Sequence, residues 1–233
     1  PFGVLRTRIA EFLAARRGDR PLFLYVNFHD THFPYHHDLV QPLVAATALP
    51  QGDIAPGRRD ALWSTYANTA ANVDRAIGEV LGDVSRAVGA EPGIVVTADH
   101  GESLYDEGFL GHGYALNDEQ TRIPLVVANL PMRIREPFGQ ADLRDALRES
   151  LSRDAGPPLL EPREGPPVLQ YLGAIDRPRQ VAFVSRQGRA TYDFRVGRFR
   201  RAGGDWQRES DLDEQARRTY LDLVRSWEGI RLA

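Results

Sequence analysis

The chain of 233 residues is long enough for one large α/β domain or for a domain with a smaller appendage, and either can bury a substantial core. Its 29 basic and 32 acidic residues give a net charge of −3, which argues against a nucleic-acid partner because such binding needs a concentrated basic face. The sequence contains no cysteine and no lysine, which excludes a catalytic thiol, a disulfide, a thiolate zinc site and a catalytic lysine in this chain.

Apolar runs are short throughout the sequence. None approaches the ~20 residues that a membrane-spanning helix needs, so we expect no transmembrane segment in this chain. The sequence begins with Pro1 and shows no signal peptide, and we therefore expect it to be part of a longer protein.

The first half of the chain predicts helices that alternate with buried strands. Residues 2–17 carry apolar side chains at helical spacing, and residues 22–28 are apolar on both faces, as in a strand covered by helices. A long helix is expected over residues 58–88. Buried strands are expected at residues 94–98 and 123–128, and this alternation predicts an α/β fold with a mainly parallel sheet and helices on both faces.

The second half of the chain changes character after a short helix predicted at residues 142–151. Residues 152–167 form a proline-rich linker, which separates an α/β core at residues 1–151 from a small α+β subdomain at residues 168–233.

Within that subdomain we expect antiparallel strands at residues 181–185 and 190–199. A C-terminal helix should begin near Ser210, with Asp213 at the third position after this cap.

Two polar segments directly follow predicted strands. The first is HDTHFPYHH, residues 29–37, which holds four of the six histidines. The second is TADHGESLYDEGFLGHG, residues 97–113, which places Asp99 beside His100 at a strand end and His112 between two glycines. A carboxylate beside an imidazole is half of a metal site, but the same pair also suits an ordinary turn with local hydrogen bonds.

The two segments would meet if the strands before them are parallel. Ligands of parallel sheets bind beyond the carboxyl ends of the strands, so both loops would lie at one edge of the sheet. We therefore expect His32 to lie near Asp99 and His100.

TADHGE followed by GHG and RIPLVV, with THFPY upstream, resembles the sulfatase branch of the alkaline phosphatase superfamily. This branch includes arylsulfatases, phosphonate monoester hydrolases, and bacterial phosphoglycerol and phosphoethanolamine transferases. The resemblance runs from Phe2 to about Leu151, and the C-terminal sheet and helix are also in keeping with it. It implies an alkaline phosphatase-like α/β fold.

Position by position, the resemblance implies that Asp99 and His100 are metal ligands and that His32 lies close to the sulfate or phosphate of the substrate. His112 stands where many arylsulfatases have a lysine, so it would contact the anionic group or the leaving oxygen. Arg122 is a further candidate for substrate contact, although it also suits a structural ion pair. An imidazole ligand favours zinc or manganese over calcium, which prefers oxygen ligands.

The chain departs from the family pattern in two ways. The family's first metal carboxylates and its nucleophile come before the region matched here, and His100 stands where arylsulfatases commonly have asparagine. We therefore expect the chain to lack the nucleophile-bearing N-terminal part of the same protein, which would be its partner, and to have no turnover alone.

These features predict a metal-dependent hydrolase of sulfate or phosphate esters, with a small-molecule, glycan or lipid-head-group substrate. One alternative is a phosphoethanolamine or phosphoglycerol transferase at a membrane surface, and another is a non-catalytic relative that serves as a binding module. The family further implies an extracytoplasmic location. The sequence leaves the ester, the metal and the oligomeric state open.

Overall fold

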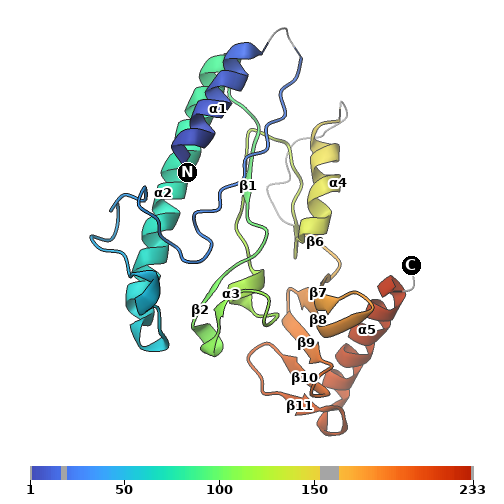
Figure 1. Ribbon diagram of the computed structural model, residues 1–233. Helices are drawn as coiled ribbons and strands as arrows, with labels where there is room; N and C mark the ends of the chain where they lie inside the picture. Colours follow the sequence, from blue (N-terminus) through green and yellow to red (C-terminus); the bar gives the residue numbers. More distant parts are fainter. Residues whose placement is uncertain (1, 17–19, 153–162, 232–233) are drawn as a thin grey trace. The chain divides into compact units, whose positions relative to one another are not determined.

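The structure, a computed structural model, describes residues 2–16, 20–152 and 163–231 (Figure 1). The chain divides into two compact units. The first comprises Pro1–Gly93 and Glu102–Gly111, and the second comprises Ile94–Gly101 and His112–Ala233.

The first unit is built on one long helix, α2 (Arg59–Val88), as predicted from its apolar spacing. Helix α1 (Phe2–Ala15) packs beside it through Ile9 and Leu13 (Figure 1). Helix α2 ends at Gly89, whose left-handed φ of 72° lets its N–H return to the carbonyl of Ser85. The other described elements of this unit are short: η1 (Gln51–Asp53), η2 (Pro56–Arg58), η3 (Asp106–Gly108), and the hairpin of β2 (Ser103–Leu104) and β3 (Leu110–Gly111).

Residues 22–28 do not form the predicted strand. They belong to no sheet in the described part of the chain, and their side chains alternate between half-buried and exposed. Leu22, Leu24, Val26 and Phe28 pack on the cluster between α1 and α2, whereas Phe23 and Tyr25 are 80% and 77% exposed. The prediction that both faces of this segment are buried was therefore wrong.

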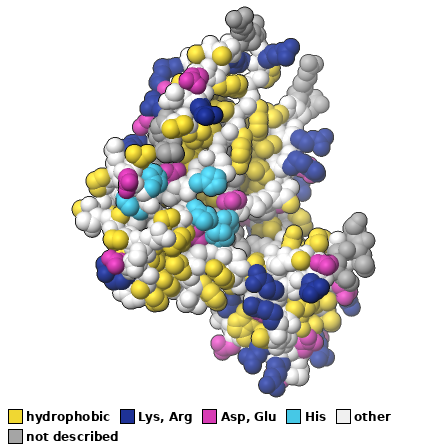
Figure 2. All heavy atoms as spheres, viewed as in Figure 1, with side chains coloured by type: hydrophobic (Ala, Val, Ile, Leu, Met, Phe, Trp, Pro, Cys, Tyr) yellow, Lys and Arg dark blue, Asp and Glu magenta, His cyan; other side chains and the backbone are white. Residues whose placement is uncertain are grey.

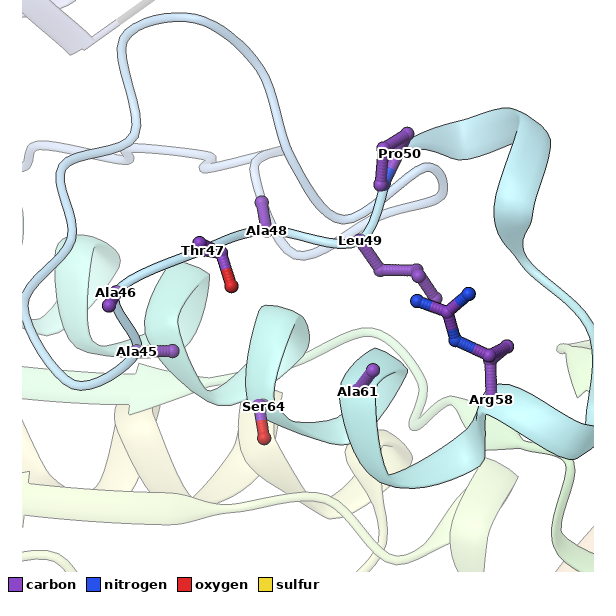
Figure 3. A pocket seen from close by; sticks show the side chains of 9 residues that line it. All are labelled: Ala45, Ala46, Thr47, Ala48, Leu49, Pro50, Arg58, Ala61 and Ser64. Carbon is purple, nitrogen blue, oxygen red and sulfur yellow. The ribbon is translucent and has the colours of Figure 1, made fainter.

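A pocket opens in the first unit, between the loop of residues 45–50 and the start of α2 (Figure 3). Its volume is about 350 Å³, and most of its lining is small and apolar, with Arg58 and Ser64 among the polar lining residues. None of the predicted site residues lines it.

The second unit begins with β1 (Ile94–Thr97), which pairs with β4 (Leu125–Ala128). Both strands were predicted, but their pairing is antiparallel, with Ile94 opposite Ala128 and Thr97 opposite Leu125. The mainly parallel sheet predicted from the sequence is therefore not confirmed. The parallel pair among the described strands is the two-residue ladder of β5 (Arg135–Glu136) and β6 (Arg163–Glu164). Two helices complete this part: α3 (Asp118–Thr121) and α4 (Gln140–Ser150).

The C-terminal part of the second unit is an antiparallel sheet with a helix on one face (Figure 1). Val181 and Phe199 from the sheet pack with Leu223 and Trp227 from the helix. This arrangement confirms the predicted combination of antiparallel strands and a C-terminal helix. The sheet order is β11 (Gln207–Arg208), β10 (Arg198–Arg201), β9 (Gly188–Asp193), β8 (Arg177–Ser185) and β7 (Val168–Ala174); η4 (Glu209–Asp211) precedes the helix α5 (Glu214–Arg231).

Two details of this part differ from the prediction. The strand expected at residues 190–199 is interrupted, because Asp193 accepts the N–H of Arg195 and Gly197 adopts a left-handed φ of 60°, which together form a turn. Asp213, rather than Ser210, caps α5, since its carboxylate accepts the N–H of Ala216 at 2.6 Å.

The predicted division into residues 1–151, 152–167 and 168–233 stays a prediction. Residues 153–162 of the expected linker lie outside the described residues. Among the residues that the structure does describe, no helix is both long and apolar enough to cross a membrane.

Candidate active site

Asp99 and His100 lie just beyond the end of β1, as the sequence predicts. The Asp99 carboxylate is exposed, with its Oδ2 3.8 Å from Nε2 of His100. The Nδ1 atom of His100 lies 2.9 Å from the carbonyl oxygen of Gly101. Because a carbonyl can only accept, Nδ1 carries the proton when the ring is neutral, and Nε2 then presents its lone pair toward the side of Asp99.

The ring of His112 stacks on the ring of His100. Their centroids are 3.7 Å apart and the planes are inclined by 29°. Both neighbours of His112 have left-handed backbones, Gly111 at a φ of 88° and Gly113 at 80°. Such angles are unfavourable for residues with a Cβ, so the two glycines are what allow the chain to bring this histidine onto the first.

Gly101 holds the strand end against the segment that follows His112. Its N–H donates to the carbonyl of Gln120 at 2.9 Å, and a Cβ at this position would lie 2.1 Å from the carbonyl oxygen of Glu119. Only glycine fits here without displacement of the α3 backbone.

The backbone of Asp99 is held from helix α4. The side-chain amide of Gln140 donates to the carbonyl of Ala98 at 3.0 Å and to that of Asp99 at 2.6 Å. Helix α4 begins at this residue, and the carboxylate of Asp142 accepts the N–H of Gly139 at 2.8 Å.

Buried amide side chains support the segment that follows His112. Gln120 is 4% exposed, and its Oε1 accepts the N–H groups of Tyr114 and Ala115 at 3.1 and 3.4 Å. Asn117 caps α3 by accepting the N–H of Gln120 at 3.2 Å. These side chains thereby satisfy backbone N–H groups that lie outside regular secondary structure.

His32 belongs to the first unit, where it is exposed and its Nδ1 lies 3.1 Å from the carbonyl oxygen of Phe33. The loop around it is fixed by Tyr35, which is fully buried and adopts a left-handed φ of 67°. The hydroxyl of Thr69 donates to the carbonyl of Tyr35 at 2.5 Å. Burial, together with the nearby Glu102 carboxylate, raises the pKa of Tyr35, so its phenol remains neutral.

The other histidines of this loop have different surroundings. His37 Nε2 lies 2.7 Å from Asp30 Oδ1, and His29 Nε2 lies 3.1 Å from the amide of Asn27. Nδ1 of His36 is buried with no hydrogen-bond partner among the described residues.

The structure therefore brings Asp99, His100 and His112 together within the second unit. Arg122, at the C-terminal end of α3, is in the same unit and is exposed. His32 lies in the other unit, and its predicted closeness to Asp99 and His100 stays a prediction. Figure 2 shows that histidine side chains reach the molecular surface.

Two donors do not complete a metal site. Within residues 2–16, 20–152 and 163–231, no group of three or more His, Cys, Asp or Glu side chains is placed to hold a metal ion. The spacing of Asp99 and His100 nevertheless suits two ligand positions around one metal ion. Two ligands that each lie about 2.1 Å from a tetrahedral ion are roughly 3.4 Å apart, close to the 3.8 Å between Asp99 and His100.

Two supporting residues, Gln120 and Gln180, belong to no motif and were not predicted. Each acts through its side-chain amide on backbone groups: Gln180 Oε1 accepts the N–H of Leu116 at 3.0 Å, as Gln120 accepts those of Tyr114 and Ala115. A glutamine in a buried position is the signal that could have drawn attention to them, because such a residue is seldom buried without a hydrogen-bond partner.

The chain is similar to known proteins in structure and in sequence. A crystal structure of a protein assigned as a sulfatase, from Bacteroides thetaiotaomicron, is similar with a TM-score of 0.46 and 12% sequence identity. The similarity covers 97% of this chain and 57% of that chain, so this chain spans little more than half the length of that protein. None of the curated proteins matches. The model of the sulfatase family matches residues 3–131, which is more than half of the sequence, and the chain therefore belongs to the sulfatase family.

Proposed function

We propose that this chain contributes to a metal-dependent hydrolase of sulfate or phosphate esters, with Asp99 and His100 as metal ligands. The observation that carries the proposal is the hydrogen bond that holds the His100 ring. Its Nδ1 is held by the carbonyl of Gly101 at 2.9 Å, which directs the lone pair of Nε2 toward the side on which the Asp99 carboxylate lies. A backbone partner on the second ring nitrogen is the usual arrangement of a metal-binding histidine.

The donor set indicates the kind of ion. One carboxylate oxygen and one imidazole nitrogen suit zinc or manganese better than calcium, which prefers oxygen ligands alone. When bound, such an ion would neutralise charge on the non-bridging oxygens of the ester. Further ligands would come from groups other than this pair.

For His112 we propose contact with the anionic part of the ester. Its ring rests on that of His100, and the glycines on both sides leave room for a ligand to approach its backbone. An imidazole can donate a hydrogen bond to a sulfate or phosphate oxygen, or a proton to the departing alcohol oxygen. His32 is proposed for the same anionic group, and Arg122 for a peripheral ion pair with it.

Metal binding by the full chain tests the proposal. Titration calorimetry with Zn²⁺ and with Mn²⁺ should show one site, and His100→Ala should weaken binding by about 100-fold or more, since a ligand matters more than the outer-shell groups that support it. His29→Ala is the matched control, because His29 is an exposed histidine in the first unit.

Equal affinity in the wild type and in His100→Ala would contradict the proposed ligand. If neither ion binds, the proposed metal site at Asp99 and His100 fails. Assays with an aryl sulfate and with an aryl phosphate would separate the two ester classes.

A further inference from the structure

The segment from Gly113 to Thr121, here called the support segment, lies on the C-terminal sheet. Three residues of that sheet hold it. Arg179 donates to the carbonyl of Gly113 at 3.1 Å, Gln180 accepts the N–H of Leu116 at 3.0 Å, and Arg189 pairs with Asp118 at 2.7 Å. These contacts join positions more than sixty residues apart in the sequence.

Gln180 is the most buried of these three. It is 4% exposed, and it lies opposite Asp193 in the pairing of β8 with β9. Its Nε2 donates to Oδ2 of Asp193 at 2.7 Å, so its Oε1 is turned toward the support segment. The orientation of the amide is thus fixed by a neighbouring carboxylate.

Asp193 is itself held in one orientation. It is 4% exposed and accepts hydrogen bonds from the backbone N–H, Nε and Nη2 of Arg195 at 2.9, 3.1 and 2.6 Å. Burial alone would raise the pKa of Asp193, but the hydrogen bonds from Arg195 and Gln180 lower it below its ordinary value. The carboxylate therefore stays ionised, with its charge paired, and remains an acceptor for Gln180.

The support segment is connected at one end to His112 and at the other to the residue next to His100. At one end it follows His112 directly through Gly113. At the other, the carbonyl of Gln120 accepts the N–H of Gly101, the residue next to His100. The stack of His100 on His112 therefore depends on a segment whose middle is held by Gln180.

We infer that Gln180, oriented by Asp193, is a positioning residue that fixes His112 against His100 from the C-terminal sheet. Gln180 makes its own contacts with Leu116 and Asp193, and it acts on the site through the support segment. This inference deepens the proposed function. The expected change in Zn²⁺ affinity rests on the proposed metal site, whereas the expected change in hydrogen exchange of the support segment does not.

The test compares Gln180→Met with Val181→Ala in the full chain. Methionine keeps the length of glutamine but removes both hydrogen bonds. Val181 is the next residue of β8; it is fully buried and packs with the α5 cluster, so its truncation weakens the same strand without a change to the hydrogen bond of Leu116. Hydrogen exchange is measured for peptides that cover residues 112–121 and, separately, α5.

In Gln180→Met we expect exchange at residues 114–117 to rise about tenfold with α5 little changed, because the buried N–H of Leu116 loses its partner. Zn²⁺ affinity should fall by about tenfold, as for loss of an outer-shell group. Val181→Ala should raise exchange mainly in β8 and α5.

Unchanged exchange at residues 114–117 in Gln180→Met would overturn the inference, as would the same exchange pattern in both variants. So would unchanged Zn²⁺ affinity in Gln180→Met when the wild type binds the ion. If the wild type binds no Zn²⁺, the proposed metal site fails, and the exchange comparison alone decides whether Gln180 holds the segment.

Discussion

The loop that carries His32 and the segment that carries His112 are both held by buried polar side chains, but from different distances along the chain. In the first, the turn is closed by local bonds from His32 to His29 and from Tyr35 to His32, with Thr69 of α2 as the more distant partner. In the second, Arg179, Gln180 and Arg189 reach back across more than sixty residues. The hydrogen bond to the first loop thus comes from helix α2, whereas those to the second segment come from two strands, β8 and β9.

This difference indicates where each loop is vulnerable. Loss of a local contact should disturb the His32 loop alone. The His112 segment should respond to changes in β8 and β9, far away in sequence. The four experiments below test this contrast, in order of decreasing effect.

Gly101→Ala should have the largest effect. A Cβ would lie 2.1 Å from the carbonyl oxygen of Glu119, so α3 or the strand end must move, and we expect the free energy of unfolding to fall by about 3 kcal/mol. Urea unfolding followed by tryptophan fluorescence measures it. Gly52→Ala is the control, because nothing lies within 4 Å of its Cβ. Equal stability of the two variants would show that the close approach at Gly101 is not a constraint.

Thr69→Val tests the His32 loop. The change removes the hydroxyl that donates to the buried carbonyl of Tyr35 but keeps the shape of the side chain. We therefore expect the free energy of unfolding, measured by thermal unfolding, to fall by about 1–2 kcal/mol. Thr219→Val serves for comparison, because its hydroxyl bonds to the carbonyl of Gln215 on the exposed face of α5. If Thr219→Val lowered the free energy of unfolding as much as Thr69→Val, the contact with Tyr35 would not be what stabilises the His32 loop.

Gly78→Ala should strengthen the helix that supports the His32 loop. Gly78 is exposed within α2 and nothing lies within 4 Å of its Cβ, so alanine should stabilise the first unit by about 0.5–1 kcal/mol through its higher helix propensity. Hydrogen exchange of α2 should slow, and exchange at residues 113–121 should stay the same. Slower exchange in both regions would contradict the separate support of the two loops.

The ionised carboxylate of Asp193 should contribute the smallest of the four effects, and its contribution to stability should depend on pH. The folded pKa of Asp193 lies below its ordinary value of 3.8, so its contribution is complete above about pH 5 and is lost as the pH falls through 3.8 and then through the folded pKa. Asp193→Asn should therefore be less stable than the wild type at about pH 6, with a difference that shrinks toward about pH 3. A difference that is constant over this range would assign the loss to packing instead.

Much of the local structure could be predicted from the sequence. The apolar spacing of residues 58–88 and the β-branched run at residues 94–97 each depend on a pattern within one element, and α2 and β1 confirm both. Strand pairing has no such local pattern. For this reason the antiparallel pairing of β1 with β4 and the absence of residues 22–28 from any described sheet both escaped prediction.

The candidate site, too, could be predicted from the sequence only in part. Asp99, His100 and His112 stand in recognisable motifs, whereas the stack of the His100 and His112 rings appears only in the structure. Gln180 stands in no motif, because its role arises only when β8 meets the N–H of Leu116, 64 residues away. Closeness of His32 to these residues remains a prediction.

The division of the chain into units has a practical consequence for dissection of the protein. The backbone passes from one unit to the other three times, after Gly93, after Gly101 and after Gly111. No single truncation or proteolytic cut can therefore release either unit as one continuous polypeptide. A separated second unit would have to be rejoined from Ile94–Gly101 and His112 onward by a new linker, and that linker would be attached directly at the histidine whose placement it is meant to preserve.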